Sequence, residues 1–133
     1  MEKNLVQPKG KVVLYARTAS PHPNDTTFIG LQMDKLRDFA KQQGFEDYVE
    51  YSDNGYSGHN ANRPSFVELN KGIEDGIVSI VIVKCVDRIF RNCIIAHEWQ
   101  RRVGSMGVTV LAMDGSHESL HIKGIFQKLL KQP

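Results

Sequence analysis

The sequence is poor in cysteine and has no long hydrophobic run. Its two cysteines, Cys85 and Cys93, are too few for a disulfide framework, and no Cys/His spacing indicates zinc, so we expect two reduced structural thiols and no bound metal. No apolar stretch is long enough to cross a bilayer, and no signal peptide opens the chain. These absences predict a cytoplasmic protein without a membrane partner.

The overall composition is that of an ordinary globular protein. Hydrophobic residues make up 41% and charged residues 24% of the 133 residues, which fits one domain that buries a real core. The net charge of only +2 does not by itself predict nucleic-acid binding. Any basic surface must therefore be local.

Apolar residues recur with periods that alternate between strand and helix along the chain. We expect strands at residues 11–16, 47–51, 79–84 and 108–113. We expect helices at residues 28–43, 64–74 and 92–103, and a last amphipathic segment at 119–131. Strands that alternate with helices of this length indicate βαβ units and one α/β domain with a mostly parallel sheet.

Charged residues gather directly after the apolar strand at 79–84. In open α/β sheets, ligands bind in the crevice outside the carboxyl ends of the strands. Arg88 and Arg91 are three residues apart, so on a helical turn they share a face, and Asp87 can hold a guanidinium by a bidentate bond. The pattern predicts a clamp for a phosphate group. A solvated helix start with a surface ion pair is the alternative.

Further cations follow the other strands of the predicted sheet. Because the carboxyl ends of parallel strands meet at one edge, five cations can face one crevice and hold an anion with several negative oxygens. These five are Arg17, Arg63, Lys84, Arg88 and Arg91.

A possible nucleophile lies in the loop after the first strand. Ser20 is three residues beyond Arg17, and its hydroxyl could attack phosphorus while the arginines stabilise the charge on the equatorial oxygens. Gln32, on the first helix, could orient a phosphate or a hydroxyl. A module that binds nucleic-acid phosphates would need the arginines but no nucleophile, and it remains an alternative.

Two other classes of α/β domain do not fit the sequence. A nucleotide-binding domain needs a glycine-rich turn after the first strand, and residues 18–23 read Thr-Ala-Ser-Pro-His-Pro instead. A receiver-like signalling domain needs acidic metal ligands at the end of the first strand, where this chain has Arg17.

Five short motifs in order along residues 11–115 resemble the serine site-specific recombinases, which include resolvases, invertases and large transposon-type integrases. The motifs are Tyr15-Ala16-Arg17, Gln32, Asp-Asn-Gly-Tyr-Ser-Gly at 53–58, Asn-Arg-Pro at 62–64 and Asp-Arg-Ile-Phe-Arg-Asn at 87–92. The combination of Ser-Gly, Arg-Pro and Asp-Arg-x-x-Arg at these separations is highly specific.

The resemblance implies a three-layer resolvase-like α/β fold with a central, mostly parallel sheet of four to five strands flanked by helices. It implies a catalytic domain at 11–118 and the start of a truncated C-terminal helix at 119–133, while the polar segment at 1–10 predicts a flexible N-terminal arm. It implies an enzyme that cleaves and rejoins DNA through a 5′-phosphoserine intermediate without any cofactor.

The same resemblance assigns roles to individual residues. Arg17, Arg63, Arg88 and Arg91 bind the scissile phosphate and stabilise the transition state. Asp87 positions an arginine and relays a proton. Supporting residues are Gln32, Ser57 and Lys84. The implied partners are DNA and other copies of the chain, as a homodimer that joins into a tetramer in the synaptic complex, in a bacterial cytoplasm at the nucleoid.

The sequence departs from the family pattern at the nucleophile. The family opens with Tyr-x-Arg-x-Ser, but here Ala19 fills the serine position and Ser20 follows it. Two interpretations stay open. In the first, the loop shifts by one residue and Ser20 attacks; in the second, the domain is catalytically inactive and binds DNA backbone or partner recombinase subunits. Asn54 is a second departure, because the family often has aspartate there, although Asp53 is adjacent.

Overall fold

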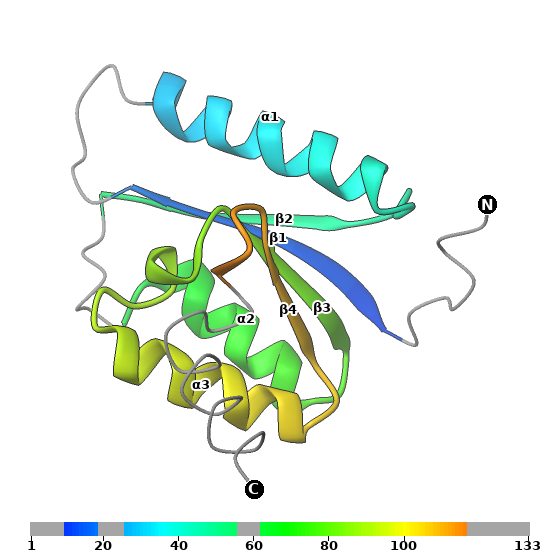
Figure 1. Ribbon diagram of the computed structural model, residues 1–133, viewed down its shortest axis with the longest axis vertical. Helices are drawn as coiled ribbons and strands as arrows, with labels where there is room; N and C mark the ends of the chain where they lie inside the picture. Colours follow the sequence, from blue (N-terminus) through cyan, green and yellow to red (C-terminus); the bar gives the residue numbers. More distant parts are fainter. Residues whose placement is uncertain (1–9, 19–25, 56–61, 117–133) are drawn as a thin grey trace, which may run out of the picture.

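The computed structural model describes residues 10–18, 26–55 and 62–116. Four strands alternate with three helices in this part of the chain (Figure 1). The strands are β1 (Lys11–Thr18), β2 (Val49–Asn54), β3 (Val78–Val83) and β4 (Thr109–Ala112). The helices are α1 (Thr26–Gln42), α2 (Pro64–Glu74) and α3 (Cys93–Ser105), and a 3-10 turn at Val86–Arg88 precedes α3.

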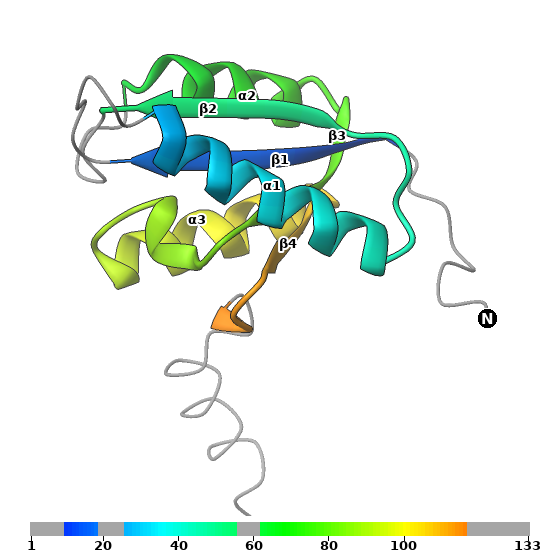
Figure 2. The same cartoon turned by 90° about the horizontal axis from the view of Figure 1, so that it is seen from above.

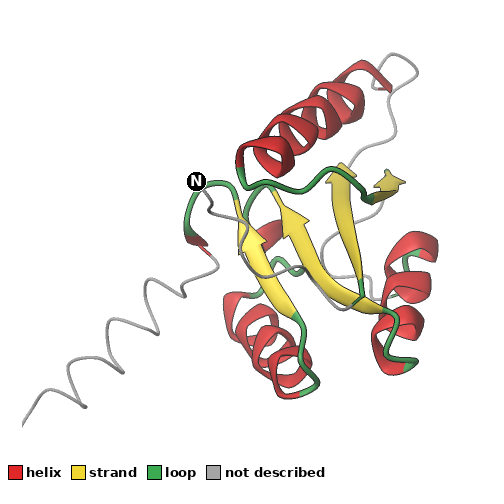
Figure 3. Ribbon diagram, turned by 90° about the vertical axis from the view of Figure 1, so that its right-hand side faces the viewer, coloured by secondary structure: helices red, strands yellow, loops and turns green. Residues whose placement is uncertain are grey.

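The strands form one parallel sheet in the order β2-β1-β3-β4. Figure 2 and Figure 3 show that α1 covers one face of this sheet and that α2 and α3 cover the other. The architecture is therefore the three-layer α/β arrangement that was expected, with four parallel strands in the described residues.

Two hydrophobic cores lie on the two faces of the sheet. Residues along β1 alternate between them, because successive side chains of a strand point to opposite faces. Val12, Leu14 and Ala16 pack on the α1 side, whereas Val13 and Tyr15 pack on the side of α2 and α3. By the same alternation, the Arg17 side chain lies on the side of α2 and α3, near the carboxyl end of β1.

The four predicted strands and the predicted helices at 28–43, 64–74 and 92–103 are confirmed, with shifted ends. The largest difference is β2, which was expected to end at residue 51 and to give way to a loop. Its ladder with β1 continues through the pairs Arg17–Asp53 and Thr18–Asn54, so backbone pairing extends the strand despite the low strand propensity of aspartate and asparagine. Gly55, with φ at 89°, then turns the chain and donates to the carbonyl of Thr18 at 2.8 Å.

The starts of α2 and α3 follow from capping signals in the sequence. Pro64 occupies the first turn of α2, where its missing N–H costs nothing. The Asn92 side chain accepts hydrogen bonds from the backbone N–H groups of Ile94 and Ile95, and so caps α3. None of the helices in the described ranges has the length and apolar character that a membrane crossing requires. The last predicted segment, at 119–131, lies outside the described residues.

Candidate active site

The strand order places a natural ligand site at the carboxyl ends of β1 and β3. From β1 the chain adds β2 toward one edge of the sheet, and from β3 it adds β4 toward the other edge. The strand order therefore reverses between β1 and β3. Such reversal points are where open α/β sheets bind ligands. Arg17 stands at the end of β1, and the segment 84–92 follows β3, so the predicted site residues of both strands meet here.

Arg17 is buried and is held from two directions. Its backbone N–H donates to Oε1 of Gln32 at 3.2 Å, and the Gln32 amide Nε2 donates back to the Arg17 carbonyl at 3.3 Å. The Arg17 guanidinium reaches across to the segment after β3, where Nε donates to the Arg88 carbonyl at 2.7 Å and Nη2 to the Asp87 carbonyl at 3.2 Å. Gln32 therefore anchors the end of β1 to α1.

Arg63 is fully buried just before α2 and bonds to the same segment. Its Nη1 donates to the Arg88 carbonyl at 3.2 Å, and its Nη2 donates to the carbonyl of Ile89. The guanidinium carbon lies 4.2 Å from the ring centroid of Phe66 and 5.4 Å from that of Phe90. The aromatic faces offer the buried cation a favourable environment. Two buried arginines thus bind three consecutive carbonyls, at residues 87–89.

Asp53 and Tyr15 complete this network; both lie in the sequence motifs, but no contact of either with the arginines was predicted. The buried Asp53 carboxylate accepts from the Tyr15 hydroxyl at 2.7 Å and from the backbone N–H groups of Ser65 and Phe66 at 2.9 and 3.0 Å. Asp53 therefore caps the N-terminus of α2 from the neighbouring strand, in place of Arg63, which has the N-cap position but makes no side-chain cap bond.

The electrostatics of the buried network favour an anion. Burial lowers the pKa of the Arg17 guanidinium, and the positive charges of Arg63 and Arg88 lower it further. Burial also lowers the pKa of Arg63, against the attraction of Tyr15 and Asp53. Both arginines stay charged, as arginines do in proteins. An anion bound near these cations would relieve their mutual repulsion.

Tyr15 keeps its proton in the folded protein. Burial raises the pKa of the hydroxyl well above its usual range, and the hydrogen bond to the Asp53 carboxylate raises it further. The hydroxyl therefore donates its single proton to Asp53 and accepts from Arg63 Nη1, at 3.1 Å, with a lone pair. It is a hydrogen-bonding link between an anion and a cation rather than a proton donor to solvent.

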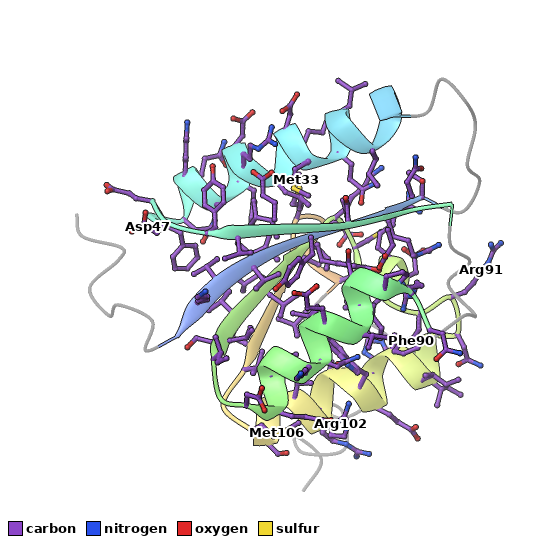
Figure 4. All side chains as sticks on the ribbon, turned by 180° about the vertical axis from the view of Figure 1, so that it is seen from behind. Met33, Asp47, Phe90, Arg91, Arg102 and Met106 are labelled. Atoms are coloured by element: carbon purple, nitrogen blue, oxygen red, sulfur yellow. The ribbon has the colours of Figure 1, made fainter. Side chains whose placement is uncertain are left out.

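The remaining predicted cations differ from the buried pair. Arg88 is half-buried, and its Nε is buried without a hydrogen-bond partner among the described residues. Lys84 and Arg91 are exposed. Figure 4 shows Arg91 pointing away from the body of the molecule near the start of α3.

The expectation that Arg88 and Arg91 share one helical face is wrong. Arg88 ends the 3-10 turn, Arg91 lies in a bend and α3 begins only at Cys93. The Asn92 side chain caps α3, which delays the helix to that point. The two guanidinium groups are therefore presented by irregular backbone, whose path depends on the bonds that Arg17 and Arg63 make to residues 87–89.

Asp87 is exposed, and its two oxygen-bearing groups have different partners. Its backbone carbonyl accepts from Arg17, whereas its carboxylate accepts from the Cys85 thiol at 2.7 Å. Burial raises the pKa of Cys85 to about 12, and Asp87 contributes to this rise through the hydrogen bond and its negative charge. The bidentate bond from Asp87 to a guanidinium stays a prediction.

The candidate nucleophile lies outside the described residues, as do Ala19 and Ser57. The last described residue before Ser20 is Thr18, at the end of β1 beside Arg17. The Thr18 hydroxyl donates to the side-chain oxygen of Asn54 and accepts from the backbone N–H of Gly55 at 3.2 Å. These bonds join the ends of β1 and β2, the two strands from which the segments with Ser20 and Ser57 continue.

One family model matches most of this chain. The profile of the family described as "Resolvase, N terminal domain" matches residues 12–131. A comparison with curated protein sequences gave no significant match.

Solved structures with this fold come from several recombinases and a transposon. The N-terminal catalytic domain of TP901-1 integrase is similar with a TM-score of 0.72 and 24% identity, over 92% of this chain and 99% of the integrase domain. The first open reading frame of transposon ISC1904 from Sulfolobus solfataricus has a TM-score of 0.67 and 27% identity, over 78% of this chain and 67% of that protein. A serine recombinase from the same organism has a TM-score of 0.68 and 22% identity, over 91% and 83% of the two chains.

Proposed function

This chain belongs to the resolvase N-terminal domain family, whose site-specific recombinases act on DNA, and we propose that it cleaves and rejoins DNA through a 5′-phosphoserine intermediate. The observation that carries this proposal is the cluster of arginines at the reversal point of the sheet. Arg17 and Arg63 are buried there and both donate to the Arg88 carbonyl, and the charges of Arg63 and Arg88 repel that of Arg17. A phosphodiester would bring the missing negative charge.

In the proposed reaction, the Ser20 hydroxyl oxygen attacks the scissile phosphorus. A bond forms between Ser20 Oγ and phosphorus, and the bond from phosphorus to the 3′ oxygen breaks. The serine gives up its proton, and a proton is delivered to the departing 3′ oxygen, so that a free 3′ hydroxyl results. Rejoining is the reverse, with a 3′ hydroxyl attacking the phosphoserine. No cofactor enters this reaction.

The arginines stabilise the charge that builds on the phosphate oxygens during both steps. We assign direct contact with the phosphate to Arg88 and Arg91, which extend from the segment after β3. Arg17 and Arg63 supply positive charge from beneath this segment. Asp87 positions an arginine and relays a proton, while Gln32, Ser57 and Lys84 support the bound phosphate. The bonds between Gln32 and the Arg17 backbone support this assignment, since they fix the strand end from which Ser20 follows.

A second candidate function is a catalytically inactive recombinase domain that binds DNA backbone or partner recombinase subunits. The observation that favours it is Ala19, which fills the nucleophile position when residues are counted from Arg17 without a gap. The two functions share every arginine and differ only in whether a serine reaches the phosphate.

For the assembly and its place in the cell, we propose a homodimer that pairs into a tetramer when two DNA sites are brought together. The proposed cellular location is the bacterial cytoplasm, at the nucleoid, because the substrate is chromosomal or mobile-element DNA. Size-exclusion chromatography with light scattering, with and without DNA, tests the assembly.

The test of the reaction is to trap the covalent intermediate. The full chain is fused to a sequence-specific DNA-binding module and incubated with DNA nicked near the cleavage position, and the digested adduct is identified by mass spectrometry. An adduct on Ser20 that Ser20→Ala abolishes establishes the active enzyme. An adduct that appears only after Ala19→Ser establishes the inactive domain. Absence of an adduct from both proteins overturns the proposed phosphate site.

A further inference from the structure

We propose that Tyr15 and Asp53 are positioning residues that act through Arg63 on the segment 87–91. This inference rests on the proposed function, because the segment carries the arginines that we assign to the phosphate. Neither residue touches the phosphate in this proposal. Their role is to fix the direction in which Arg63 holds the backbone from which Arg88 and Arg91 extend.

Asp53 is built into the fold from three sides. The Asp53 residue is only 2% exposed. Its carboxylate accepts hydrogen bonds from the Tyr15 hydroxyl of β1 and from two backbone N–H groups at the start of α2. A buried carboxylate with three donors is held in one orientation, because each lost bond would leave a desolvated charge without compensation. Asp53 is therefore a fixed reference point that links β2, β1 and α2.

Tyr15 passes this orientation to Arg63. A phenol has one proton, and Asp53 receives it at 2.7 Å, so the lone pairs of the hydroxyl are directed toward Arg63 Nη1 at 3.1 Å. A carboxylate acceptor strengthens the bond on one side of the hydroxyl and makes the oxygen a better acceptor on the other. The neutral Tyr15 hydroxyl therefore lies between the Asp53 carboxylate and the Arg63 guanidinium.

Arg63 carries the effect to the segment after β3. Nη1 is shared between the Tyr15 hydroxyl and the Arg88 carbonyl at 3.2 Å, and Nη2 bonds to the Ile89 carbonyl. The guanidinium is planar, so fixing Nη1 against Tyr15 also fixes the direction of Nη2. A change at Tyr15 is thereby converted into a change of the backbone between Arg88 and Arg91.

Packing alone does not account for this arrangement. The Tyr15 ring packs on Phe66 with centroids 5.8 Å apart, and a phenylalanine would make the same contact. The hydroxyl is the only part of Tyr15 that joins Asp53 to Arg63. The substitution Tyr15→Phe therefore removes the positioning link and keeps the hydrophobic core.

The matched control is a side-chain hydrogen bond between α2 and α3 that lies outside the proposed site. Trp99 Nε1 donates to Asn70 Oδ1 at 2.8 Å, and Asn70 has no part in the proposed site. Asn70→Ala removes one partly buried side-chain bond away from the proposed site, whereas Tyr15→Phe removes two bonds within it. The control therefore shows whether loss of a side-chain bond between elements is enough to produce the effect.

The first measurement is nuclear magnetic resonance of the Arg63 guanidinium in the full chain. In the parent protein we expect two separate Nη signals, because bonds on both sides hinder rotation. In Tyr15→Phe the Nη1 signal should shift and exchange between the two signals should become faster, because Nη1 keeps only its bond to the Arg88 carbonyl. In Asn70→Ala both signals should stay as in the parent protein. Unchanged signals and exchange in Tyr15→Phe would overturn the inference. This measurement does not depend on any activity.

The second measurement is the rate of phosphoserine formation on nicked DNA at saturating DNA, with the serine that proves reactive. We expect Tyr15→Phe to lower the rate about tenfold, or about 1.4 kcal/mol of transition-state stabilisation, with unchanged DNA affinity. Asn70→Ala should leave the rate unchanged. In an Arg63→Lys background, Tyr15→Phe should have no further effect, because its target is gone. An equal tenfold loss in that background would overturn action through Arg63.

The two measurements separate this inference from the proposed function. If no protein forms an adduct, including Ala19→Ser, the phosphoserine reaction is refuted, and the guanidinium signals alone decide whether Tyr15 positions Arg63. If the parent forms the adduct and Tyr15→Phe forms it at the same rate, the reaction is upheld and the positioning role is refuted.

Discussion

The buried arginines and the exposed cations of the candidate site have different surroundings although they lie around the same segment. Arg17 and Arg63 donate to backbone carbonyls at residues 87–89 and are shielded from solvent. Arg91 and Lys84 are exposed, and Arg91 points outward in Figure 4. Under the proposed function, this difference gives the motif arginines two roles at the phosphate site. The buried arginines hold the segment at residues 87–91 in place, and the arginines of that segment contact the phosphate.

This division can be tested by comparing stability with activity. Removing a buried arginine should damage the fold first and the reaction as a consequence. Removing an exposed one should damage only the reaction.

The largest effect is expected for Arg63→Ala. The substitution leaves the Ile89 carbonyl and the Tyr15 hydroxyl without the Arg63 donor and removes one of the two donors to the Arg88 carbonyl. It also opens a cavity beside Phe66. We expect a loss of about 3–5 kcal/mol in the free energy of unfolding, measured with urea. Arg91→Ala is the control and should change stability by less than about 0.5 kcal/mol. Similar losses in both variants would refute the division.

Arg91→Ala should have the next largest effect, and on the reaction alone. If Arg91 contacts the phosphate, its removal should lower the rate of phosphoserine formation about a hundredfold, or about 2.7 kcal/mol. The measurement is the single-turnover rate on nicked DNA. Lys41→Ala is a suitable control, because substituting this exposed lysine at the end of α1 also removes one positive charge. Equal rate losses in the two variants would mean that only net charge matters.

A smaller effect is expected for Asp53→Ala. It removes the cap of α2 and leaves the buried Tyr15 hydroxyl without its acceptor, so we expect a loss of about 2 kcal/mol in unfolding free energy. Asp47→Ala is the matched control, since Asp47 is exposed at the opposite end of β2 (Figure 4). A variant at Asp53 as stable as the one at Asp47 would show that the carboxylate does not hold the network.

The smallest effect concerns Cys85 and reports on Asp87. With the pKa of Cys85 raised to about 12, about one thiol in ten thousand is a thiolate at pH 8, so alkylation should be slow and should speed up as the pH rises toward 12. Asp87→Asn removes a charge that raises this pKa, so it should lower the pKa and speed alkylation several-fold. Peptide mapping separates Cys85 from Cys93. An unchanged rate would mean that burial alone controls the thiol.

Much of the fold could be predicted from the sequence, because the hydrophobic runs of β1 and β3 and the caps at Pro64 and Asn92 are local signals. The predicted α/β class and parallel sheet are confirmed. The end of β2 could not be predicted, since Asp53 and Asn54 join the strand only through pairing with β1. Leu31 fits the apolar pattern of α1 but is 52% exposed, because the core side of the helix is set by Met33, Leu36 and Ala40.

The sequence indicated which cations gather at the carboxyl ends of the strands. It did not indicate which of them are buried and which are exposed. Sequence motifs predict functional roles for Arg17 and Arg63, yet nothing local shows that their guanidinium groups are buried against carbonyls. Asp53 was overlooked as a site residue because its partners, Tyr15 and the start of α2, are distant along the chain. The signal that could have found it is an acidic residue at a strand end followed by Pro64 at a helix start.

The Arg88 carbonyl, which accepts from both buried arginines, also bears on how the chain folds. It joins residues separated by 71 positions in one bond and by 25 in the other. Contacts between such distant residues require large loops to close, and these closures are slow. We therefore expect the arginine cluster to assemble only after β1, β3 and α2 have come together. A partly folded chain would then lack the complete arginine cluster.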